Sequence, residues 1–227
     1  MDSEARRRLI VEAVTPLFAR KGFAGVTTRE IAQAAGVSEA LVFRHFPTKA
    51  ALYDEILKLG CQGDPKLVRL EELPPSTATL VLIIHGLVRH IVLGELGDKG
   101  LVETRMRLVL HSMMEDAEYA RLHFADVARR VLPIFTASMR VAREDGDLRP
   151  DGPDLANAFW YACHVATFIA LGFMTEGGVV PYRGDAVTVV AQAARFILRG
   201  IGLRDEIVDA PFDPAALEEL KGAGAAG

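Results

Sequence analysis

The sequence predicts an all-α protein, and three observations support this prediction. Apolar residues recur at helical spacing along most of the 227 residues, and no segment shows the sustained alternation of a strand. Residues that cap helices stand at the starts of several periodic segments, and glycines stand at their ends. Half of the residues are hydrophobic and a quarter are charged, which is the balance of a globular chain with a substantial core.

The first thirty-six residues predict a long helix followed by a short one. Thr27 and Glu30 have the spacing of a capping box, in which each side chain satisfies a backbone N–H of the other residue. The short helix that this box opens ends at Gly36. The long helix spans residues 3–22, with a cationic face opposite apolar residues at helical spacing: Leu9, Ile10, Ala13, Val14, Leu17 and Phe18.

A second short helix and a fourth helix follow. Ser38 can cap a helix that must end before Pro47, because proline cannot continue the hydrogen-bond ladder. Thr48 can cap the next helix, which runs from Lys49 to about Gly60. Two short helices that are joined by a glycine-containing turn and flanked by longer helices have the layout of a helix-turn-helix unit.

The second short helix has an inner and an outer face. Val42 and Phe46 are four residues apart, so we expect both to pack against the first short helix. With Val42 inward, four residues turn outward: Ala40, Leu41, Phe43 and Arg44. Outward leucine and phenylalanine side chains need a partner surface.

A connector rich in proline and acidic residues, GDPKLVRLEELPPST, predicts a division into two domains. We expect a helix-turn-helix domain over residues 1–60 and a larger helical domain over residues 61–227, with a disordered tail over about residues 222–227. The end of the chain, FDPAALEELKGAGAAG, predicts one small helix before that tail. Five further segments of the larger domain have helical periodicity: about 76–95, 98–114, 116–144, 153–176 and 184–201.

The charge is unevenly distributed. Residues 1–49 hold eight Lys or Arg and five acidic residues, a net charge of +3, although the whole chain carries −4. A basic N-terminal end on an acidic remainder suits phosphate contact by that end only. Cys61 and Cys163 form neither a disulfide framework nor a metal-binding pattern, and the N-terminus lacks the apolar core of a signal peptide. The most apolar run, residues 79–88, is too short to cross a bilayer, so we expect a cytoplasmic protein without a membrane partner.

Residues 22–57, GFAGVTTREIAQAAGVSEALVFRHFPTKAALYDEIL, resemble the DNA-binding segment of the TetR family of bacterial transcriptional repressors. The resemblance lies in the TTREIA opening, the AGVS turn, the aromatic–x–His–Phe end and the Pro–Thr–Lys restart. It implies a homodimer in which each recognition helix, here Ser38 to Phe46, enters a major groove, with half-sites about 34–36 Å apart.

The resemblance also implies which residues contact DNA. His45 and Lys49 match the phosphate-contacting histidine and lysine of the family, and Arg44 can take a phosphate or a guanine edge. The backbone N–H groups at the Thr27/Thr28 start of the first short helix, with the hydroxyls of both threonines and Arg29, would bind phosphates. The expected DNA-binding residues are Thr27, Thr28, Arg29, Ser38, Glu39, Ala40, Leu41, Phe43, Arg44, His45 and Lys49.

Three of these positions depart from the family pattern. Phe43 stands where the family usually has tyrosine, so a phosphate hydrogen bond is lost. Leu41 occupies a position that is often polar, and it can pack on a thymine methyl group. Glu39 can accept a hydrogen bond from cytosine N4, or it can stabilise the start of its helix as an anion in the first turn.

For the larger domain, the resemblance implies a small-molecule pocket and a dimer interface through helices about 153–176 and 184–201. Trp160 and His164, four residues apart on one helix face, are the best candidate pair for the pocket, although such residues at helical spacing also form ordinary cores. The apolar composition favours an apolar or aromatic effector. The candidate ligand-binding residues are Arg105, Met106, His111, Met113, Met114, Tyr119, Phe124, Phe135, Met139, Trp160, Cys163, His164 and Phe168.

The sequence contains no pattern of an active site. His111 and Glu115 have metal-ligand spacing, but no third ligand is evident, and no phosphate loop or nucleophile elbow is present. We therefore expect neither an enzyme nor a metal or other cofactor. The predicted function is that of a DNA-binding transcriptional repressor, released from a palindromic operator by a small ligand. The alternative is a helical ligand-binding or scaffold protein whose helix-turn-helix domain is weak or unused.

Overall fold

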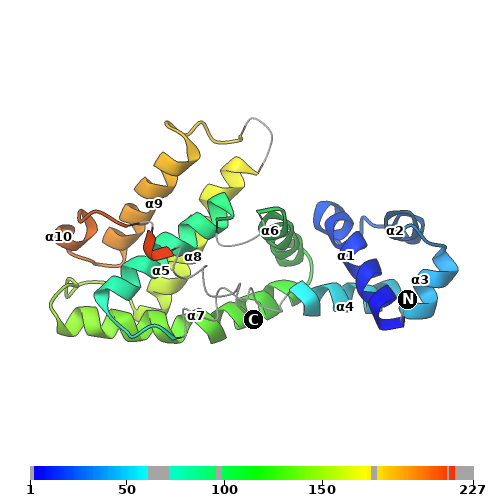
Figure 1. Cartoon of the computed structure of the whole chain (residues 1–227), viewed down its shortest axis with the longest axis horizontal. Coiled ribbons are helices and arrows are strands. Elements are labelled where there is room, and N and C mark those ends of the chain that lie inside the picture. The colour runs from blue at the N-terminus through cyan, green and yellow to red at the C-terminus, as the bar shows by residue number, and fades with distance from the viewer. Residues whose placement is uncertain (1–2, 61–71, 96–98, 175–177, 214, 218–227) are drawn as a thin grey trace. The chain divides into compact units, whose positions relative to one another are not determined.

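The computed structural model describes residues 3–60, 72–95, 99–174, 178–213 and 215–217. Every named element in these ranges is a helix (Figure 1), and one isolated bridge joins Leu148 to Leu203, so the all-α prediction is confirmed. The helices are α1 (Ser3–Lys21), α2 (Thr28–Ala35), α3 (Glu39–His45), α4 (Lys49–Gly60), α5 (Thr77–Leu93), α6 (Lys99–Met114), α7 (Glu118–Glu144), α8 (Leu155–Phe173), α9 (Ala186–Gly200) and α10 (Asp205–Val208).

The described helices agree with the predicted segments to within a few residues at each end. Helix α10 was not predicted, because four residues are too few to show a period. Most of the predicted connector, and most of the predicted small C-terminal helix with its tail, lie outside the described residues.

The chain divides into two compact units, and the division differs from the predicted domain boundary. The head unit comprises Met1–Gly63 and Glu103–Asp126, and the body unit comprises Asp64–Val102 and Val127–Gly227. Residues 103–126 lie in the second of the two domains that the sequence predicts. The structure groups them with the head because the small helix-turn-helix core is completed by four of their side chains: Leu108, Val109, Tyr119 and Ala120.

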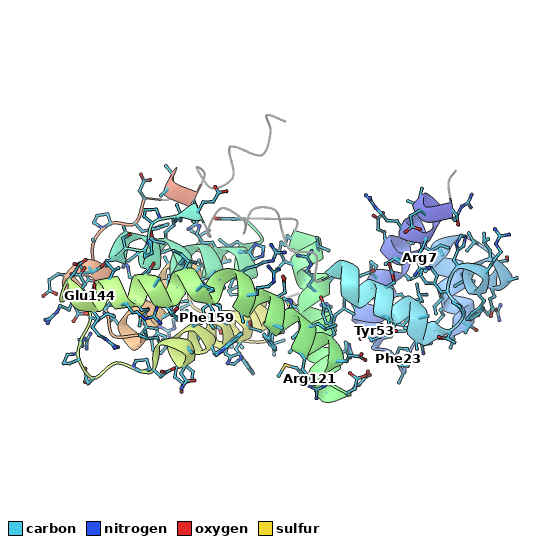
Figure 2. The ribbon with its side chains drawn as sticks, turned by 90° about the horizontal axis from the view of Figure 1, so that it is seen from below. Arg7, Phe23, Tyr53, Arg121, Glu144 and Phe159 are labelled. Carbon is cyan, nitrogen blue, oxygen red and sulfur yellow. The ribbon has the colours of Figure 1, made fainter. Side chains whose placement is uncertain are left out.

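Within the head unit, α1 packs against α2 and α4, and α2 packs against α3 (Figure 1). Phe18, Phe23 and Tyr53 form an aromatic cluster, with the Tyr53 ring centroid 5.2 Å from that of Phe18 and 5.1 Å from that of Phe23. Figure 2 labels Phe23 and Tyr53, which come from the α1–α2 turn and from α4. Other fully buried side chains of this core are Ile10, Val14, Ile31, Val42, Phe46, Leu52 and Ile56.

Within the body unit, α5 packs against both α8 and α9, and α8 and α9 contact each other. The rings of Phe135 on α7 and Phe159 on α8 lie 5.3 Å apart and connect these two helices (Figure 2 labels Phe159). Helix α8 is long and apolar enough to cross a membrane by length and composition, the one such helix in the described ranges. Its buried side, which includes Ala158, Phe159, Ala162 and Ala166, faces the core of the unit.

Candidate nucleic-acid interface

The start of α2 is fixed by the predicted capping box. The backbone N–H of Glu30 donates to Thr27 Oγ1 at 3.3 Å, and Glu30 Oε2 accepts from the backbone N–H of Thr27 at 3.0 Å. Lys21 at the end of α1 forms an ion pair with the same carboxylate. The hydrogen bonds from Lys21 and Thr27 lower the pKa of Glu30 to about 2. The carboxylate therefore stays ionised at any ordinary pH, and it holds α1 and α2 together at the predicted phosphate-contacting end.

The turn between α2 and α3 depends on one glycine. Gly36 has φ 65°, in the left-handed region that favours glycine, and its N–H donates to Gln33 O at 3.2 Å. The N–H of Val37 donates to Ala32 O at 3.0 Å and closes the end of α2. Ser38, two residues after Gly36, caps α3: its side-chain oxygen accepts a hydrogen bond from the N–H of Leu41 at 3.2 Å. These contacts fix the direction in which α3 leaves α2.

Helix α3 has the inner face that the sequence predicts, and its outer face is narrower than predicted. Val42 and Phe46 are buried, while Ala40 and Arg44 are exposed. Leu41 and Phe43 are half-buried rather than fully outward. They flank Val42 by one residue, about 100° to each side around the helix, so they lie at the edges of the buried face.

Arg7 on α1 contacts both α3 and α4. Its Nη1 donates to the backbone oxygen of His45 at 2.8 Å, and its Nη2 donates to Glu55 Oε2 at 3.1 Å. Its guanidinium carbon lies 4.4 Å from the centroid of the Phe46 ring. The carbonyl of His45 belongs to the last turn of α3, where it has no partner within the helix. Arg7, labelled in Figure 2, therefore holds the C-terminal end of the recognition helix against α4.

Replacing Arg7 with alanine is expected to weaken operator binding about tenfold. A hydrogen bond to a charged group contributes about 1.5–3 kcal/mol, and we expect only part of this free energy to hold α3 in the orientation that binds DNA. The dependence of affinity on salt should not change, since Arg7 positions α3 without touching phosphate. Glu55→Gln should also weaken binding, although the loss of a negative charge would by itself strengthen it. Fluorescence anisotropy at several salt concentrations measures both effects.

Arg8→Ala is the matched control for this prediction. Arg8 lies on the same helix and pairs with Glu12 at 3.0 Å, but both side chains are exposed, and such pairs contribute little. Its replacement should leave operator affinity nearly unchanged. A salt slope reduced by about 0.9 in Arg7→Ala would mean that Arg7 contacts a phosphate, and the positioning role would then be wrong.

His45, the last residue of α3, and Lys49, the first residue of α4, are both partly buried. The Lys49 ammonium lies 4.5 Å from the centroid of the Phe23 ring. Burial lowers the pKa of Lys49, while the charges of Glu115 and Glu30 raise it. The Nε2 atom of His45 is buried and has no hydrogen-bond partner among the described residues. The cation of Lys49 is therefore held in place by a ring before any DNA arrives.

The candidate ligand-binding residues are divided between the two units. Seven belong to the head unit and six to the body unit. Tyr119 is fully buried in the head core, whereas Met113, Met114 and Phe168 are exposed, Phe168 to 72%. Trp160 and His164, the best predicted pair, have stacked rings 6.5 Å apart. Burial raises the pKa of the Cys163 thiol to about 12, so this cysteine is an unreactive core residue.

The helical pair His111 and Glu115 packs against the end of α1. A Cβ atom at Gly22 would lie 2.9 Å from Glu115 Oε1 and 3.2 Å from His111 Nδ1. No group of three His, Cys, Asp or Glu residues with the spacing of a metal site occurs in the described part of the chain. These two side chains therefore serve as packing partners of the α1–α2 turn.

An all-α chain with a capped helix-turn-helix in its head unit has the architecture of a bacterial DNA-binding regulator. Residues 10–56, from α1 into α4, match the family model of bacterial regulatory proteins of the tetR family. Two curated relatives are the repressor KstR2 of Rhodococcus jostii, 38% identical over 53 residues, and the repressor Rv3405c of Mycobacterium tuberculosis, 42% identical over 82 residues. These matches cover 23% and 35% of this chain, and 26% and 42% of the relatives.

Solved structures resemble the chain over nearly its whole length. A tetR-family regulatory protein from Rhodococcus RHA1 superposes with a TM-score of 0.64 at 20% identity, covering 90% of this chain and all of the other. AibR, in complex with isovaleryl coenzyme A and operator DNA, gives a TM-score of 0.64 at 16% identity, covering 88% of this chain and all of AibR. NalD of Pseudomonas aeruginosa, a repressor of a multidrug efflux pump, gives 0.61 at 21%, covering 90% and 100%. The fold of the chain is the fold of TetR-family regulators.

Proposed function

We propose that this protein is a homodimeric, sequence-specific transcriptional repressor that a small ligand releases from a palindromic operator. The capped helix-turn-helix carries this proposal, because it presents Ala40 and Arg44 on one exposed face beside a fixed cation, Lys49. The relatives KstR2 and Rv3405c are named as transcriptional repressors.

We assign DNA contact to the residues expected from the sequence. The Thr27 hydroxyl is already engaged by Glu30 in the free chain, donating to Glu30 Oε2 at 2.8 Å, so Thr28, Arg29 and the backbone supply the phosphate contacts at the start of α2. Half-buried Leu41 and Phe43 offer apolar edges to thymine methyl groups. Exposed Arg44 reads a base or a phosphate from the last turn of the helix.

We assign dimerisation to α8 and α9, whose outer surfaces carry large apolar side chains. Tyr161 and Phe168 are 57% and 72% exposed, and they lie seven residues apart, on one face of α8. Phe196 on α9 is 67% exposed. Aromatic side chains that remain this exposed in one chain mark a protein interface, and α8 contacts α9 within the body unit. Two copies would form a four-helix interface.

Alanine replacements on the recognition face test the DNA-binding role. Arg44→Ala and Lys49→Ala are each expected to weaken operator binding about tenfold or more, and a residue that contacts phosphate should also reduce the salt slope by about 0.9. The measurement is fluorescence anisotropy on duplexes that tile the DNA upstream of the gene, with competitor DNA, at two salt concentrations. The dimer should remain intact.

Arg140→Ala on α7 is the control, since Arg140 is an exposed cation of the body unit. Unchanged affinity in Arg44→Ala and Lys49→Ala would contradict the assignment of the recognition face. Weak, uniform binding of the wild-type protein to every duplex would instead favour the alternative, a helical ligand-binding protein with an unused head.

Glu39→Gln tests what the acidic residue that begins α3 does: it can read cytosine N4, repel phosphate, or only stabilise the start of its helix. Ser38, not Glu39, supplies the capping hydrogen bond, and the Glu39 side chain is exposed. If Glu39 reads cytosine N4, the variant should tolerate substitution at one base pair of the operator, where a mismatch ordinarily costs about 1–3 kcal/mol. If Glu39 acts only by repelling phosphate, non-specific affinity should rise at every sequence. Binding curves on single-substitution operators separate these results, and unchanged curves would leave Glu39 a helix-start residue.

A further inference from the structure

Arg105 on α6 has a buried donor without a partner inside the head unit. Its side chain is half-buried, and its Nε atom is fully buried without a hydrogen-bond partner among the described residues. Two other cations of this unit have carboxylate partners: Arg7 pairs with Glu55, and Lys21 pairs with Glu30. A buried donor without an acceptor costs free energy, and in a native protein it calls for an explanation such as a missing ligand.

The surroundings of Arg105 favour a negatively charged ligand. His123 on α7 lies close enough to feel its charge, and burial followed by the Arg105 charge lowers the pKa of His123 to about 4, against the opposing charge of Asp126. The imidazole is therefore neutral at physiological pH and can donate one hydrogen bond. The rings of Tyr119 and Phe124, centred 6.1 and 5.5 Å from that of His123, supply apolar surface beside it.

We propose that Arg105 and His123 form the anion-binding end of the effector site, and that the effector is a carboxylate- or phosphate-bearing molecule with an apolar body. The planar guanidinium suits two parallel hydrogen bonds to such an anion, and the neutral imidazole adds a third donor. This inference rests on the proposed function, since it names the ligand class of the same regulator. The sequence predicts only an apolar or aromatic effector, and this proposal adds an anionic group to it.

The site lies where a ligand can influence the DNA-binding helices. Tyr119 takes part in both places, since its ring lies beside His123 and it is fully buried in the core that also contains Phe18 and Val42. All of these residues belong to the head unit. A ligand that moves α6 against α7 must therefore repack the core on which α1 and α3 rest, which shifts the population of DNA-competent heads.

The first test compares acids with neutral analogues of the same shape. Hexanoate, octanoate, benzoate and hexyl phosphate are titrated against the protein–operator complex, beside hexanamide, octanamide, benzamide and hexanol. At least one anion is expected to release the protein at a concentration at least tenfold below that of its neutral partner. A preference for hexyl phosphate over hexanoate would identify the group as phosphate, and the reverse preference would identify it as carboxylate.

Arg105→Gln should abolish the preference for anions. Arg121→Gln is the matched control, because Arg121 is an exposed cation of α7 in the same unit, hydrogen-bonded to the backbone oxygen of Asp116 at 3.0 Å. This control should keep the preference. Equal release by every anion and its neutral partner, or a preference that survives in Arg105→Gln, would overturn the proposal.

A second measurement needs no ligand. If Arg105 is held for an absent anion, Arg105→Met should raise the Tm of the ligand-free protein by about 2–4 °C, as replacements at functional sites often do. A lowered Tm would show that Arg105 serves the fold, and the site would then be refuted. Operator binding by the wild-type protein is measured separately. If the wild-type protein does not bind an operator, the proposed repressor function is refuted, but the Tm comparison still tests the role of Arg105.

Discussion

Phe168→Asp is expected to convert the proposed dimer into a monomer at micromolar concentration. Removing a central aromatic side chain typically costs an interface about 2 kcal/mol or more, and a buried unpaired carboxylate adds several kcal/mol. The fold of the single chain should survive, because Phe168 is 72% exposed within it. Operator affinity should fall by about two orders of magnitude, since the second head is no longer tethered to the first. Sedimentation velocity and anisotropy measure the two losses.

Leu122→Asp is the control for this result. Leu122 on α7 is 46% exposed and belongs to the head unit, whereas Phe168 belongs to the body unit. It introduces the same charge in place of an exposed apolar side chain, and it should remain dimeric. A Phe168→Asp protein that stays dimeric would place the interface elsewhere.

Phe46→Ala is expected to unfold the head unit while the body unit keeps its structure. Phe46 is fully buried at the end of α3, and truncating a buried phenylalanine costs about 3–5 kcal/mol. The cation of Arg7 also loses the ring over which it lies. Hydrogen exchange should show lost protection in α1, α2 and α3 and retained protection in α5, α8 and α9. DNA binding should be lost, while the dimer should persist.

Leu9→Ala provides the comparison within the same unit. Leu9 is 50% exposed on α1, and surface truncations of this kind usually change stability by less than about 0.5 kcal/mol. A loss below about 1 kcal/mol in Phe46→Ala would mean that the core tolerates the cavity. The buried face of α3 would then contribute less to the head than its burial indicates.

The local features of the head were predictable because each depends on residues that lie only a few positions apart in the sequence. The capping box needs only Thr27 and Glu30 at the right spacing, and Gly36 marks the left-handed end of α2. The same rules placed Ser38 at the start of α3. The half-burial of Leu41 and Phe43 was misjudged because helical periodicity gives a direction around the helix and not the width of the partner surface.

Contacts between distant parts of the chain were not predictable. Arg7 belongs to a run of three arginines, and nothing in that run separates it from Arg8, which is exposed, or indicates the His45 carbonyl 38 residues away. His123 was overlooked because its environment comes from Arg105 on another helix. The roles of both residues depend on tertiary packing, which a single sequence does not encode locally.

The membership of residues 103–126 in the head unit has a practical consequence for protein engineering. A fragment that ends at residue 60 would leave the apolar residues that face Leu108, Val109 and Tyr119 exposed to water, and it should aggregate or unfold. A chimaera that exchanges operator specificity between regulators of this fold should therefore carry over both segments of the head unit, residues 1–63 and 103–126. Alternatively, the recipient should keep side chains equivalent to Leu108, Val109, Tyr119 and Ala120. In this chain, the helix-turn-helix can be transferred to another protein only together with the side chains of α6 and α7 that complete its core.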